Sequence, residues 1–250
     1  MNDMTIEEYL AHGGKLSSPA NVPPRYRGEL LRLMASFVDS ELAASAGFAD
    51  TINDAPGIKS RIAAARIVME KADHAERVLA VMADFGVDTA RYEDVHPWAA
   101  RLPREADIGA RRQGGDMRLS VFHYPLDGWI DAVAMNVLQG AAAVIQIEEY
   151  ARVSYQPLAE VFRAIAPREG RHAELGREGL ARIAMTEAGR ASAQASIDYW
   201  RPRVATGFGP AGSARFEILR RFGLRHRPNE ALLADWTAVT DALLRDFNLT

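Results

Sequence analysis

Apolar residues recur along most of this chain at spacings of three and four, the pattern of helices that bury one face. Alternation typical of strands is scarce, and Pro or Gly residues separate long segments rich in Ala, Leu, Arg and Glu. The pattern therefore predicts an all-α fold. The long predicted helices cover residues 27–52, 58–85, 126–152 and 157–185. Shorter predicted helices cover residues 6–12, 187–206, 212–222 and 229–246.

The connections between the long helices predict their arrangement. Residues 53–57 and residues 153–156 are short turns, so the four helices pair as two antiparallel hairpins. Residues 87–125 join the hairpins and are too many for a simple turn. Two long hairpins with a long crossover are typical of a ferritin-like four-helix bundle, with the shorter helices packed outside it. We expect a single domain over residues 1–250, with a short N-terminal extension at about residues 1–24.

Composition narrows the class of protein. The 250 residues are 48% hydrophobic and 25% charged, with a formal net charge of −3, as in an ordinary soluble globular protein. The absence of cysteine excludes disulfides, thiolate metal sites and a cysteine nucleophile. The near-neutral charge argues against a nucleic-acid partner. A small local cluster of arginines is expected on a solvated helix end: Arg220, Arg221, Arg225 and Arg227.

No stretch of the chain is typical of a membrane segment. A spanning helix needs about 20 apolar residues, and the richest stretch, residues 131–147, carries Asn136, Gln139 and Gln146. The acidic first residues lack the apolar core of a signal peptide. These features predict a cytoplasmic protein without a membrane partner.

Ionisable or amide side chains lie on the apolar stripe of each long predicted helix. Burying an ionisable group costs several kcal/mol unless it is paired or bound to metal, so these positions mark candidate chemistry. We expect them to meet at a similar depth in the bundle. In chain order they are Glu41, Lys71 with His74, Gln139, and Glu169 with His172.

Glu169 and His172 form a Glu-x-x-His pair on one helix face. A di-iron carboxylate bundle takes such a pair from each of two helices and a lone carboxylate from each of the other two. In the second helix, Lys71 stands three residues before His74, where a glutamate is needed. Glu70 lies near the same face and would replace the lost ligand if the helix rotates slightly. The predicted metal ligands are Glu41, Glu70, His74, Glu169 and His172.

Other histidines and the tryptophans have a simpler interpretation. His96 and His123 fall in the polar crossover, where we expect loop histidines rather than metal ligands. The tryptophans are expected in the core or in subunit contacts rather than in a substrate cage. They are Trp98, Trp129, Trp200 and Trp236.

Around these residues the chain resembles the ferritin-like subunits of bacterial phenylacetyl-CoA epoxidase, a multicomponent oxygenase of aerobic phenylacetate degradation. In that family's catalytic subunit, the resemblance implies a carboxylate at the position of Lys71, where it bridges two irons, and another at the position of Gln139. Here the first is a cation and the second a neutral amide. The matching stretches are residues 40–52, 74–86, 138–142 (LQGAA), 154–176 (SYQPLAEVFRAIAPREGRHAELG) and 199–210 (YWRPRVATGFGP).

The resemblance leaves three hypotheses open. The first, which we favour, is a metal-free or metal-poor subunit of a hetero-oligomer, in which Lys71 pairs with Glu41 and Glu169 and supports a homologous catalytic subunit. The second is a working di-iron monooxygenase subunit that receives electrons from a reductase and uses O2 on an aryl- or acyl-CoA thioester. The third is a mononuclear iron site, with Lys71 moved aside. Its ligands would be Glu41, His74, Glu169 and His172.

Overall fold

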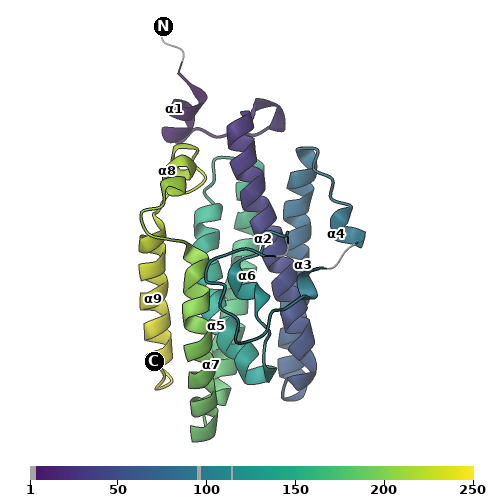
Figure 1. Ribbon diagram of the computed structural model, residues 1–250, viewed down its shortest axis with the longest axis vertical. Helices are drawn as coiled ribbons and strands as arrows, with labels where there is room; N and C mark the ends of the chain where they lie inside the picture. The colour runs from purple at the N-terminus through teal and green to yellow at the C-terminus, as the bar shows by residue number, and fades with distance from the viewer. Residues whose placement is uncertain (1–3, 95–96, 114) are drawn as a thin grey trace.

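The computed structural model describes residues 4–94, 97–113 and 115–250, so His96 lies outside it. Within these ranges the chain is helical, with one isolated bridge and no strand (Figure 1). The four long helices are α2 (Pro24–Thr51), α3 (Gly57–Asp84), α5 (Gly128–Tyr150) and α6 (Gln156–Ile183). The shorter helices are α1 (Ile6–Ala11), α4 (Arg91–Asp94), α7 (Glu187–Ala205), α8 (Ala214–Arg221) and α9 (Asn229–Arg245). The predicted all-α arrangement of two long hairpins and a crossover is confirmed.

Each hairpin packs along its length, α2 against α3 and α5 against α6, and α3 also packs against α6. Two glycines allow α5 and α6 to approach closely. A Cβ atom at Gly140 would lie 3.2 Å from the Cα of Ala173, and one at Gly176 would lie 2.7 Å from the Nδ2 of Asn136. Larger residues at these positions would push apart the two helices that flank the predicted site.

Helix α5 is the central helix of the molecule. It packs against α6, α7, α9 and α2, and every residue from 131 to 138 is buried. By length and composition alone it is apolar enough to cross a membrane, but 67% of its most apolar window is buried inside the bundle. A helix that is apolar all round is expected when other helices cover every face.

The crossover is more ordered than its polar sequence suggested. It carries α4 and two short 3₁₀ helices, η3 (Pro97–Ala99) and η4 (Ser120–His123), and it folds against α2. Trp98 is buried and its indole nitrogen donates to Asp39, 3.1 Å away. His123 lies in the crossover as predicted, and it is buried in η4. The order of the crossover could not be predicted, because polar residues that hydrogen-bond to one another leave no apolar pattern in the sequence.

Arg118 holds the crossover together. The residue is 2% exposed, and its side chain pairs with Asp116 at 2.6 Å and donates to three backbone carbonyl oxygens within residues 97–100. We expect Arg118→Ala to lower the free energy of unfolding by about 3–5 kcal/mol, because it removes the cationic partner of the buried Asp116 carboxylate and one hydrogen bond to each of three carbonyl oxygens. Urea denaturation followed by circular dichroism measures this. Arg111→Ala, an exposed control, should change stability by less than about 0.5 kcal/mol, and equal effects would contradict this role.

The N-terminal segment packs on one end of the bundle, where α1 contacts α8. Leu10 and Leu16 are buried there. The Nζ atom of Lys15 donates to the carbonyl oxygens of Arg152 and Val153, at 2.9 and 3.1 Å, in the turn between α5 and α6. The predicted extension therefore caps the hairpin formed by α5 and α6.

Candidate metal centre

The predicted site residues converge from three helices at the middle of the bundle. Glu41 comes from α2, Lys71 and His74 come from α3, and Glu169 and His172 come from α6. Glu41 is 7% and Lys71 is 6% exposed, and the other three are at most 1% exposed. Each lies on the stripe that its helix turns toward the core, which is why their spacing alone predicted that they would meet.

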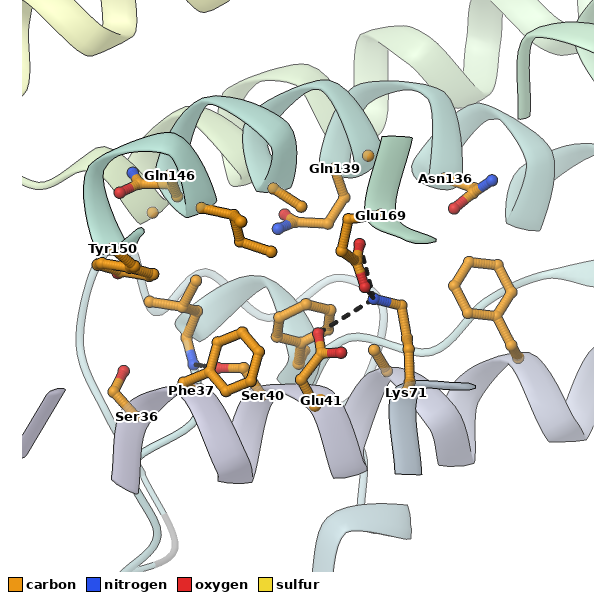
Figure 2. Close-up of a pocket in the computed structure, with 18 residues that line it drawn as sticks. Ser36, Phe37, Ser40, Glu41, Lys71, Asn136, Gln139, Gln146, Tyr150 and Glu169 are labelled. Carbon is orange, nitrogen blue, oxygen red and sulfur yellow. Dashed lines mark hydrogen bonds and ion pairs between the residues drawn. The ribbon is translucent and has the colours of Figure 1, made fainter. Parts of the chain in front are cut away.

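Lys71 lies between the two central carboxylates (Figure 2). Its Nζ atom is 3.0 Å from Glu41 Oε1, and 3.0 and 3.3 Å from the two carboxylate oxygens of Glu169. Burial alone would lower the pKa of Lys71, but the charges of Glu169 and Glu41 and the hydrogen bonds to them raise it above its ordinary value. The side chain is therefore an ammonium ion, paired as the sequence predicted.

His74 faces the same two carboxylates. Its Nδ1 atom is 3.1 Å from Glu41 Oε2 and 3.1 Å from Glu169 Oε1. Burial alone would lower the pKa of His74, but the hydrogen bonds to Glu169 and Glu41 raise it. Burial would likewise raise the pKa of Glu169, yet the charge of Lys71 and hydrogen bonds from His172 and His74 hold it well below its ordinary value. The cluster thus favours two carboxylates balanced by cations.

His172 lies at the edge of the cluster, with its ring centroid 5.8 Å from that of His74. Its Nδ1 atom is 3.3 Å from Glu169 Oε1, and its Nε2 atom is 2.7 Å from Glu70 Oε2. Asn136 on α5 donates to the backbone oxygen of His172 at 3.1 Å. Glu70 therefore meets the outer nitrogen of His172 and does not lie between the central carboxylates, although its role as a ligand stays a prediction.

Glu70 supplies the hydrogen-bond partner of a buried imidazole nitrogen. We expect Glu70→Ala to lower the free energy of unfolding by about 1–3 kcal/mol, because it leaves the Nε2 atom of His172 unpaired. Glu70→Gln retains a polar partner and should cost less. Chemical denaturation of both variants measures the difference, and an alanine variant as stable as the glutamine variant would show that this contact is dispensable.

A cavity opens beside the cluster on the side of α5. Its free volume is about 80 Å³, and Glu41, Lys71 and Glu169 line its inner end. Gln139 reaches into it from α5 (Figure 2). The polar side chains farther along it were not predicted as site residues, although serines on the apolar face of α2 were a signal. They are Ser36, Ser40, Gln146 and Tyr150.

The donors present suit one metal ion better than two. One ligand atom from each of Glu41, His74 and Glu169 lies within 4.8 Å of the others, and the Nε2 atom of His74 has no hydrogen-bond partner in the described ranges. Two dications do not fit, because the ammonium of Lys71 is bonded to both carboxylates that would bridge them and repels a cation at that distance. Helix α5 offers an amide at Gln139 instead of a fourth carboxylate.

Comparison with known proteins places this bundle in a family. The model of the family described as phenylacetic acid catabolic protein matches residues 4–250. One component of the 1,2-phenylacetyl-CoA epoxidase of Escherichia coli (strain K12) is 26% identical over 208 residues, which cover 82% of this chain. The match spans 62% of that relative's length. Since the family model covers almost the whole chain, the protein belongs to the phenylacetic acid catabolic protein family.

Proposed function

We propose that this chain is a bundle subunit of a phenylacetyl-CoA epoxidase-type complex in which an ion cluster replaces the two-metal centre. It would support a homologous catalytic subunit, which would receive electrons from a reductase in the cytoplasm. The observation that carries the proposal is the position of the Lys71 ammonium, 3.0 Å from a carboxylate oxygen of both Glu41 and Glu169.

The ion cluster supplies the charge of a metal without its reactivity. An ammonium ion donates hydrogen bonds to carboxylates and balances their charge, but it has no empty orbital or accessible redox state with which to bind or reduce O2. The cluster therefore keeps the geometry of the bundle core. It provides no route to oxygen chemistry while Lys71 stays in place.

Metal analysis tests this proposal. After expression in iron-supplemented medium, mass spectrometry should find well below one iron per chain, and the absorption spectrum should lack an oxo-bridged iron band. Two irons per chain together with that band would overturn the proposal and favour a working oxygenase subunit.

A second candidate, an iron oxygenase subunit that acts on an aryl- or acyl-CoA thioester, is favoured by the cavity beside the cluster. Near Tyr150 the cavity adjoins a hollow lined by Arg32, Arg112, Arg215 and Arg225. Arg225 is 8% exposed and donates to Gln146 at 2.6 Å, so its expected place on a solvated helix end was wrong. Within the described ranges Arg225 pairs with no carboxylate, whereas Arg215 pairs with Glu29 at 2.8 Å, and an unpaired guanidinium group suits a phosphate.

Isothermal titration calorimetry with phenylacetyl-CoA and with CoA tests the second candidate. The second candidate requires that the chain binds the thioester, that Arg225→Gln weakens this binding at least tenfold, and that the chain also holds iron. Thioester binding without iron would leave the chain a ligand-binding subunit, and absence of both would exclude the oxygenase role.

A further inference from the structure

A line of exposed apolar residues runs along the outer face of α3. Ile58, Ile62 and Met69 are 74%, 55% and 65% exposed. Ala65 and Ala72 are exposed on the same line. Successive members are four, three, four and three residues apart, the spacing of a coiled-coil seam. Helix α3 packs on α2 and α6 with its other faces and forms one side of the bundle (Figure 1), so this α3 seam faces outward.

We propose that the α3 seam binds a second copy of this chain, with the two α3 helices antiparallel about a two-fold axis near residue 67. In that register Ile62 faces Ala72 of the other copy, and Met69 faces Ala65 of the other copy. Ile62 and Met69 then each meet a small side chain, as interdigitated helix packing requires, and Ile58 lies at the end of the contact, opposite Glu76 of the other copy. The same contacts occur twice, which is the self-complementarity that a two-fold interface needs.

The charges that border the α3 seam fit the antiparallel orientation. Lys59 and Arg61 lie at its N-terminal end, and Asp73 and Glu76 lie at its C-terminal end. Antiparallel pairing brings the basic end of one copy to the acidic end of the other, whereas parallel pairing brings like charges together. Asp73 already has two arginine partners, so the complementarity rests mainly on Glu76 and Lys59, which have no ion pair in the described ranges. Arg66 lies beside the axis, where its long side chain can extend into solvent.

The inference concerns the outer surface and is independent of metal in the core. Burying Ile62 and Met69 of each copy against alanines of the other removes contiguous apolar area from water, which is the main favourable contribution to association. Glutamate in the seam would place a charge in that dry contact, yet glutamate favours helix and would leave α3 folded.

Sedimentation velocity of the full chain tests the association. The wild-type chain should form a dimer, and Ile62→Glu and Met69→Glu should each raise the dissociation constant at least tenfold with unchanged helicity by circular dichroism. Met185→Glu is the matched control, because Met185 is 78% exposed but lies outside the α3 seam. A wild-type chain that stays monomeric at roughly 100 μM, or a dimer that both seam variants leave intact, would overturn the proposal.

Engineered cysteines test the orientation without background, because the chain has no cysteine. Residues 62 and 72 are about 15 Å apart along one helix, too far for a disulfide within one copy. The double variant Ile62→Cys with Ala72→Cys should therefore oxidise to a covalent dimer, while each single variant should not. A single variant that cross-links to itself would indicate parallel pairing and overturn the register.

Binding of a different partner to the α3 seam would give a different experimental result. If the chain alone stays monomeric, and Met69→Glu abolishes assembly with a homologous bundle subunit while Met185→Glu does not, the seam belongs to that subunit. That result would overturn the pairing with a second copy.

Discussion

Lys71→Met should lower the free energy of unfolding by about 3–5 kcal/mol, the cost of removing one partner from a buried ion pair. Methionine fills a similar volume but leaves Glu41 and Glu169 buried without the cation that lies 3.0 Å from each. The desolvation cost of both carboxylates remains, and most of the compensating attraction is lost. Chemical denaturation followed by circular dichroism at neutral pH measures the loss.

A double variant separates the effect of charge from the effect of shape. Glu41→Gln in the Lys71→Met background removes one of the unpaired carboxylates, so it should recover part of the stability that Lys71→Met loses. In the wild-type background the same change should destabilise, because it takes a partner from Lys71 and His74. If Glu41→Gln has the same effect in both backgrounds, the cluster is not held by charge.

The sequence predicted the bundle well because periodicity, turn lengths and Pro or Gly punctuation all act locally. The same periodicity placed Glu41, Lys71 and Glu169 on inward stripes, and the structure brings them within hydrogen-bond distance. Helix rotation decides the finer detail. Glu70 is one position before Lys71 on α3, so it contacts the outer nitrogen of His172 rather than the centre of the ion cluster. The spacing of apolar residues does not distinguish two neighbouring positions of this kind.

The crossover and the mouth of the cavity were not predictable in the same way. Arg118 and Arg225 are buried although arginine is usually exposed, because neighbouring carbonyl, amide or carboxylate groups accept their hydrogen bonds. Those partners are distant in sequence or lie in segments without periodicity. Burial of this kind depends on tertiary contacts, which composition and spacing do not encode.

Lys71→Glu should turn the ion cluster into a metal site. The substitution removes the ammonium and completes a second Glu-x-x-His pair beside Glu41, Glu169 and His172. Without metal, three carboxylates and no ammonium would share one buried site, so the metal-free variant should be much less stable than the wild-type chain. Fe(II) or Mn(II) should then bind and restore stability, by about 2.7 kcal/mol at a free concentration one hundred times the dissociation constant.

Metal content by mass spectrometry and the melting temperature with and without Mn(II) measure this outcome. Lys71→Gln is the matched control, since it removes the same positive charge without supplying a carboxylate ligand. The expected order of bound metal is Lys71→Glu above Lys71→Gln above the wild-type chain, because an amide oxygen is a weaker ligand than a carboxylate and an ammonium repels the ion. Equal metal content in the glutamate and glutamine variants would show that Glu41, His74 and Glu169 converge for charge pairing alone, and that Lys71 does not occupy the place of a metal.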